Sequence, residues 1–139
     1  MVEPAYYIER LTEPEAYLIT LHTVFDPATD MQTYFEELSA RLDEETAPIT
    51  SIVDIRDLTF TFTDLLGTTR DLQNMKVNPT RHRMSKKFIV VSESKLMKAS
   101  MDGFRRFGIF RDAQIVLTVE DALRVINEDD SNGTATRLA

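Results

Sequence analysis

The chain opens with two short apolar runs, at residues 5–11 and 16–23, both rich in aromatic and β-branched residues. Thr12-Glu13-Pro14-Glu15 lies between them and is typical of a turn, because proline fixes its own φ angle and removes a hydrogen-bond donor. Two strand-like runs this close together predict an antiparallel hairpin.

A helix is predicted to follow the hairpin. Asp26-Pro27 suits a helix start, since aspartate accepts hydrogen bonds from free N–H groups and proline fits the first helical position. Pro48 ends the segment. The apolar residues between these points recur at helical spacing and predict one buried stripe: Met31, Tyr34, Phe35, Leu38 and Leu42.

Strand-like and helix-like segments then alternate to the end of the chain. Apolar runs at residues 49–55, 88–91 and 114–119 predict three more strands. The helices that follow them are predicted to start near Thr63 or Asp64, at Ser94 and at Thr118. The order ββαβαβαβα predicts an α/β fold with a mixed, mostly parallel sheet, an N-terminal antiparallel hairpin and helices packed against the sheet.

A length of 139 residues predicts a single domain. We place it at residues 1–127. Residues 128–139 are acidic and then small and polar, with too little apolar surface to offset the entropy of ordering, so they are predicted to form a flexible C-terminal tail.

The charge and composition narrow the choice of partners. A formal net charge of −7 disfavours binding to nucleic acid or to anionic membranes. The absence of cysteine excludes disulfides, thiolate metal sites and cysteine nucleophiles. No apolar run approaches the roughly 18 residues of a membrane span, and the N-terminus lacks the features of a signal peptide. We therefore expect a cytoplasmic protein without stable membrane insertion.

Residues capable of acid–base or metal chemistry are few. The two histidines, His22 and His82, are distant in sequence, and no catalytic or phosphate-loop motif accompanies them. Asp54, Asp57 and Asp64 would gather near the carboxyl end of a parallel strand, which is where α/β folds bind ligands. A magnesium site is one interpretation of these acids, and caps and solvated charges in turns are the favoured one. We expect no enzyme, no metal and no cofactor.

Two further patterns concern docking. The basic residues between Lys76 and Lys87 would suit a phosphate or an acidic partner, although a solvated loop is the simpler interpretation. Met97, Met101 and Phe104 share one helical face, which is typical of the core. Any exposed part of that stripe would suit an adaptable docking surface.

Three segments give the chain a resemblance to the STAS family, the sulfate-transporter and anti-sigma-factor-antagonist domain. They are residues 52–60 (Ile-Val-Asp-Ile-Arg-Asp-Leu-Thr-Phe), residues 88–92 with the helix from Lys95 to Gly108, and residues 115–126 with Thr-Val-Glu-Asp-Ala-Leu. The resemblance covers roughly residues 6–126 and rests on pattern and order. It implies an STAS-like fold and a regulatory role.

Regulatory members of that family carry Asp-Ser-Ser/Thr-Gly at the start of the second helix, where a partner kinase phosphorylates a hydroxyl. The corresponding residues here are Phe62-Thr63-Asp64-Leu65. Thr63 keeps a hydroxyl, Asp64 stands at the next position, and the family's aspartate and glycine are absent. A helix N-terminus attracts anions, so the Asp64 carboxylate would occupy that place permanently, and simple helix capping is the plainer alternative.

The leading hypothesis is a non-enzymatic regulatory module that docks a protein partner at the start of the second helix. The resemblance implies an anti-sigma factor or a kinase-like regulator as that partner. The residues predicted to take part are Phe62, Thr63, Asp64, Leu65, Met97 and Met101. The alternative is an STAS-like or Sec14-like domain that binds a small apolar or lipid ligand, suggested by the aromatic residues of the hairpin and by Phe60 and Phe62. An open sheet edge would also allow a homodimer.

Overall fold

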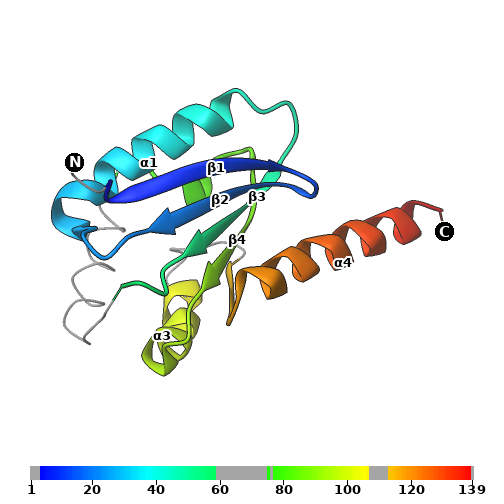
Figure 1. The fold of residues 1–139 in the computed structure, drawn as a ribbon. Helices are drawn as coiled ribbons and strands as arrows, with labels where there is room; N and C mark the ends of the chain where they lie inside the picture. The colour runs from blue at the N-terminus through cyan, green and yellow to red at the C-terminus, as the bar shows by residue number, and fades with distance from the viewer. Residues whose placement is uncertain (1–3, 59–74, 76, 107–112, 139) are drawn as a thin grey trace.

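The computed structural model describes residues 4–58, 75, 77–106 and 113–138, and the strands in these ranges form one five-stranded sheet in the order β1-β2-β3-β4-β5 (Figure 1). β1 and β2 pair antiparallel, and every later pair is parallel. The α/β class and the mixed sheet with an antiparallel hairpin are therefore confirmed. The strands are β1 (Tyr6–Thr12), β2 (Glu15–Leu21), β3 (Ile49–Asp54), β4 (Ser85–Val91) and β5 (Ala113–Val116).

Three α-helices and one short 3-10 helix are described around this sheet: α1 (Pro27–Asp43), η1 (Pro79–Arg81), α3 (Lys95–Arg106) and α4 (Val119–Leu138). The helix predicted to start near Thr63 or Asp64 lies outside the described residues. No helix in the described ranges is both long enough and apolar enough to cross a membrane.

Three of the four predicted helix starts are confirmed, and each has a side-chain hydrogen bond at its first turn. Asp30 in the first turn of α1 accepts a hydrogen bond from the backbone N–H of Asp26 at 2.8 Å. Ser94 Oγ accepts from the N–H of Met97 at 3.2 Å at the start of α3. Thr118 Oγ1 accepts from the N–H of Asp121 at 3.1 Å at the start of α4. Each bond satisfies an N–H group that has no partner inside its helix.

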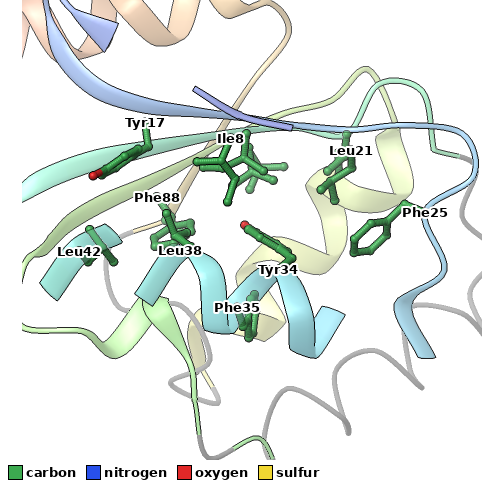
Figure 2. Close-up of a cluster of buried hydrophobic side chains, with 14 of the residues drawn as sticks. Ile8, Tyr17, Leu21, Phe25, Tyr34, Phe35, Leu38, Leu42 and Phe88 are labelled. Carbon is green, nitrogen blue, oxygen red and sulfur yellow. The ribbon is translucent and has the colours of Figure 1, made fainter. Parts of the chain in front are cut away.

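The main core lies between one face of the sheet and helices α1 and α3. Figure 2 shows the α1 side chains Tyr34, Leu38 and Leu42 pointing toward the strands. The predicted stripe is confirmed, because four of its five residues are buried and Met31 packs against the same cluster. Right-handed crossovers between successive parallel strands place their helices on the same face, which explains why α1 and α3 share this core.

A smaller core covers the opposite face of the sheet. Side chains alternate along a strand, so Val53 enters the main core while its neighbour Ile52 points to the other side. There Ile52 packs with Ile89 of β4 and with Ala122 and Ile126 of α4. β3 is consequently buried on both faces, as its continuous apolar run predicts.

Several predicted boundaries differ from the structure; β4, for example, begins at Ser85 rather than at Phe88. The last strand was predicted to reach Val119, but β5 ends at Val116, because Thr118 caps a helix that begins at Val119. A flexible tail was predicted for residues 128–139; α4 continues as a helix to Leu138, and the flexibility of this end stays a prediction. Extending a helix whose first turns already exist adds one hydrogen bond per residue without a new nucleation cost, which accounts for the continuation.

Candidate functional site

The parallel strands β3, β4 and β5 end together, because Asp54, Val91 and Val116 are in register. The residues that follow these three positions therefore emerge along one edge of the sheet. In open α/β sheets this carboxyl edge is the usual place for binding. The exposed residues there define what we call the carboxyl-edge surface: Arg56, Asp57, Glu93, Leu117 and Glu120.

The turn after β3 has an anchored backbone and two exposed side chains. The Ile55 side chain is buried, and its N–H group donates to the Val91 oxygen at 3.1 Å. The Leu58 N–H group donates back to the Ile55 oxygen at 3.0 Å, which closes the turn. Between these anchors Arg56 and Asp57 are exposed. The backbone of the turn is thus held rigidly while its two charged side chains face solvent.

Arg56 is held by Asp54 in a bidentate contact. Its Nε lies 3.0 Å from Asp54 Oδ1 and its Nη2 lies 2.8 Å from Oδ2, and its backbone N–H donates to Oδ1 at 3.1 Å. Burial alone would raise the pKa of Asp54, but the bonds from Arg56 outweigh it, so the pKa lies below its ordinary value. Asp54 therefore stays ionised and orients the guanidinium.

The predicted site residues fall into two groups. Phe62, Thr63, Asp64 and Leu65 lie outside the described residues, so their role stays a prediction. Met97 and Met101 are 6% and 2% exposed and belong to the main core, as the helical stripe indicates. Any contact between α3 and a partner in this conformation would come from its exposed residues rather than from these two methionines.

The three acids considered as a magnesium site do not act alike. Asp54 is already bound to Arg56, Asp57 is exposed, and Asp64 lies outside the described residues. Among the residues that the structure describes, no group of three or more histidine, aspartate or glutamate side chains is placed to hold a metal ion. Of the two acids that the structure describes, Asp54 pairs with Arg56 in the turn and Asp57 is exposed to solvent.

The two histidines lie at opposite ends of the parallel strands. His22 follows β2 at the carboxyl edge, while His82 precedes β4 at the amino edge. The His82 Nε2 atom lies 2.6 Å from Asp43 Oδ1, and Nδ1 accepts from the Met84 N–H at 3.0 Å. Both ring nitrogens are engaged, so His82 links α1 to the segment before β4 and has no nitrogen left to serve as a base in this arrangement.

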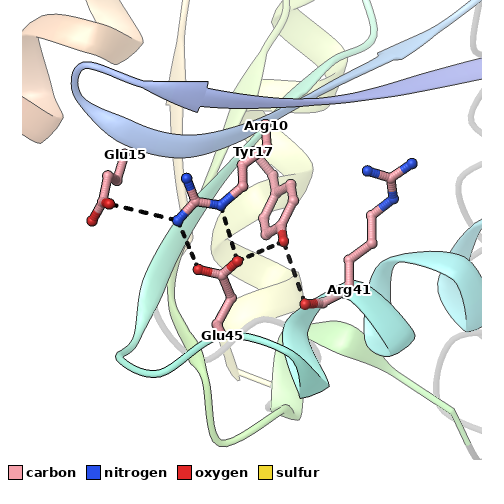
Figure 3. A network of polar contacts seen from close by, with 5 residues as sticks. All are labelled: Arg10, Glu15, Tyr17, Arg41 and Glu45. Carbon is pink, nitrogen blue, oxygen red and sulfur yellow. Dashed lines mark hydrogen bonds and ion pairs between the residues drawn. The ribbon is translucent and has the colours of Figure 1, made fainter.

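A polar network at the amino edge was not predicted (Figure 3). Arg10 of β1 donates two hydrogen bonds to the Glu45 carboxylate, from Nε to Oε2 at 3.0 Å and from Nη2 to Oε1 at 2.9 Å. The Tyr17 hydroxyl donates to Glu45 Oε2 at 2.8 Å and lies 3.3 Å from the Arg41 backbone oxygen. Arg10 and Glu45 are 35 positions apart, so no local pattern in the sequence indicates their contact.

The network shifts the ionisation of its members. The hydrogen bond from Arg10 is the main cause that lowers the pKa of Glu45. Burial, followed by the bond to Glu45, raises the pKa of Tyr17 to about 12. At neutral pH the network therefore consists of an ionised glutamate, a charged arginine and a neutral tyrosine.

A pocket of about 260 Å³ opens beside this network, at the ends where the parallel strands begin. We call it the amino-edge pocket. Its lining includes residues 46–50, which run from the loop after α1 into the start of β3, and Ile126 of α4. Its charged residues are Arg10, Glu15, Glu45 and Lys86.

The basic stretch and the aromatic hairpin also have defined places. Within the stretch, Lys87 pairs with Asp129 of α4 at 3.2 Å, Lys86 lines the amino-edge pocket, and Arg81 and Arg83 are exposed.

In the hairpin, Tyr17 is buried in the main core, while Tyr7 is 58% exposed. The rings suggested as the wall of an apolar pocket thus fill the core or face solvent, and Phe60 and Phe62 lie outside the described residues.

Comparison of the chain with models of known protein families gives no match, and comparison with curated proteins gives none either. The resemblance to the STAS family therefore stays a prediction from the pattern and order of three segments.

Proposed function

We propose that this chain is a non-enzymatic regulatory module that docks a protein partner on the carboxyl-edge surface, centred on the turn after β3. The observation that carries the proposal is the exposed, backbone-anchored turn with Arg56 held by Asp54. This is the turn that leads toward the predicted start of the second helix at Thr63 and Asp64.

Arg56 has the properties of an interface anchor. Its side chain is 39% exposed, yet the bidentate contact with Asp54 fixes its orientation. Arginine is enriched among the residues that dominate binding energy, and a side chain already ordered loses less entropy when a partner binds. The guanidinium keeps N–H groups that can reach a carboxylate or a carbonyl of the partner.

The neighbouring residues extend this anchor into a surface. Leu117, directly after β5, is 61% exposed and offers an apolar contact on the same edge. Glu93 and Glu120 are exposed there and raise the pKa of Arg56, after the larger effect of Asp54. An apolar contact with a charged rim is the usual composition of a protein interface.

Affinity capture from cell extract tests the proposal. Asp57→Lys reverses an exposed charge on the turn, and Leu117→Asp removes the apolar contact; both should lose a partner that the unmodified chain recovers. Glu9→Lys is the matched control, because Glu9 is an exposed carboxylate on β1, and it should retain the partner. Equal recovery by all four proteins would refute docking at this surface.

A second variant set addresses the segment outside the described residues. If the partner also contacts the predicted helix start, Asp64→Lys should weaken capture as Asp57→Lys does. Thr63→Val should then show whether the hydroxyl matters. The partner that the STAS resemblance implies is an anti-sigma factor or a kinase-like regulator, and mass spectrometry of the captured protein identifies its class.

A further inference from the structure

The amino-edge pocket lies at the other end of the parallel strands from the proposed docking surface. Four segments distant in sequence build it: the hairpin, residues 45–50 after α1, Lys86 of β4 and Ile126 of α4. In Figure 1 the hairpin tip, the loop after α1 and α4 lie toward the right of the view, at the end where the parallel strands begin. The volume of about 260 Å³ falls just below the range of about 300–1,000 Å³ that is typical of drug-sized ligands, so its occupant would be small.

The four charged residues of the pocket balance one another. Arg10 and Lys86 carry positive charge, and Glu15 and Glu45 carry negative charge. A ligand with a net charge would upset this balance, whereas an uncharged ligand or one with a charge of each sign would preserve it. Of these two, a zwitterion can also form ion pairs with both kinds of charged side chain in the lining.

The roles of the four residues are unequal. Both oxygens of Glu45 are engaged, by Arg10 and by Tyr17, so Glu45 serves to hold Arg10 in place. The Arg10 side chain uses Nε and Nη2 in that contact, and Figure 3 shows Nη1 pointing away from Glu45. Glu15 is 73% exposed and lies 3.7 Å from Arg10 Nη2, beyond hydrogen-bond distance. Glu15 is thus the carboxylate with the most capacity for another cation.

We propose that the amino-edge pocket binds a small zwitterion of the free amino acid class. The ligand carboxylate lies against Arg10 and Lys86, and its ammonium group lies against Glu15. A guanidinium held by a bidentate contact is preorganised to receive a second carboxylate. This binding does not depend on the docking proposal, because the two surfaces share no residue.

NMR titration of the full chain tests the proposal, with L-serine and L-glutamine as probes of two sizes. We expect at least one of them to shift the backbone amide signals of Thr46, Ala47 and Ile49 with a dissociation constant of about 1 mM or tighter. Acetate and ethylammonium, each with a single charge, should bind at least about tenfold more weakly at the same ionic strength. No shift with either amino acid, or equal binding of acetate, would overturn the proposal.

Two variants and two controls locate the site. Glu15→Gln and Lys86→Met should each weaken binding by about tenfold, because each removes one half of the charge match. Glu9→Gln and Lys98→Met change exposed residues on β1 and α3 and should leave binding unchanged. Circular dichroism of each variant confirms that the fold is retained. Unchanged binding in both pocket variants contradicts the assignment.

Discussion

Glu45 is the carboxylate on which three segments converge. It lies two residues after the end of α1. Its carboxylate accepts hydrogen bonds from the Arg10 guanidinium of β1 and from the Tyr17 hydroxyl of β2. Its side chain is 13% exposed, so a large part of its hydration has been replaced by these bonds. A bidentate contact of this kind ties the hairpin to the end of α1 more firmly than an exposed ion pair would.

Glu45→Gln removes the charge and keeps the shape. The pKa of folded Glu45 lies below its ordinary value, so its ionisation stabilises the fold above the pKa of an unfolded glutamate, and this contribution is lost as the pH falls through the folded pKa. We expect the variant to lose about 1–2 kcal/mol of unfolding free energy at neutral pH. The difference should shrink as the pH is lowered past about 4. Urea unfolding across this pH range measures it.

The exposed Glu9 provides the control for that series. Glu9→Gln should match the unmodified chain at every pH, because Glu9 is exposed on the same strand as Arg10. A Glu45→Gln difference that stayed constant from neutral to acid pH would show that the charge of Glu45 does not stabilise the fold.

Two buried serines form a matched pair for a second prediction. Ser92 Oγ accepts a hydrogen bond from the Ser94 N–H at 3.1 Å, whereas Ser51 Oγ in the middle of β3 has no hydrogen-bond partner among the described residues. Ser92→Ala should lower the free energy of unfolding by about 1 kcal/mol, and Ser51→Ala should leave it unchanged or raise it by up to about 1 kcal/mol. Chemical unfolding of both variants checks the sign. Equal losses would mean that the Ser51 hydroxyl has a partner.

At the scale of the elements, local signals in the sequence predict helix starts well and strand ends poorly. Ser94 and Thr118 were predicted as caps and act as caps, because a cap depends on residues within one turn of it. The end of β5 was predicted three residues too late, at Val119. Leu117 and Val119 continue the apolar run in the sequence. The strand nevertheless ends at Val116, because Thr118 caps the helix that begins at Val119.

Ser94→Ala tests the contribution of one cap. We expect a loss of about 1 kcal/mol of unfolding free energy, since the Met97 N–H would lose its acceptor. Ser100→Ala, within α3, is the matched control and should have little effect, because alanine has the higher helix propensity. Thermal unfolding of the two variants gives the comparison, and similar losses in both would remove Ser94 from the role of cap.

At the scale of the whole molecule, the class of fold could be predicted and the polar edges could not. Continuous apolar runs such as 49–55 indicate parallel strands, because a strand that is buried on both faces has no polar face to interrupt the run. The Arg10–Glu45 contact depends on how the hairpin meets the end of α1, which no local pattern records. The exposure of Arg56 and Leu117 likewise follows from the alignment of three strand ends rather than from their own sequence.

The C-terminal part of α4 provides a prediction at this scale. The described contacts of α4 with the rest of the chain involve residues up to Asp129, which pairs with Lys87. Removing residues 131–139 should therefore change the free energy of unfolding by no more than about 0.5 kcal/mol. A loss of about 2 kcal/mol or more in urea unfolding would show that this end of the helix stabilises the domain.

Site-specific photocrosslinking in cells tests the central claim, that a partner docks on the exposed turn after β3. A benzophenone amino acid replaces Asp57 in one variant and Glu9 in another, so that the same probe reports on two exposed positions. The account predicts a discrete protein adduct at position 57, absent at position 9 and lost when Leu117→Asp is added. No adduct at position 57, or the same adducts at both positions, would contradict it.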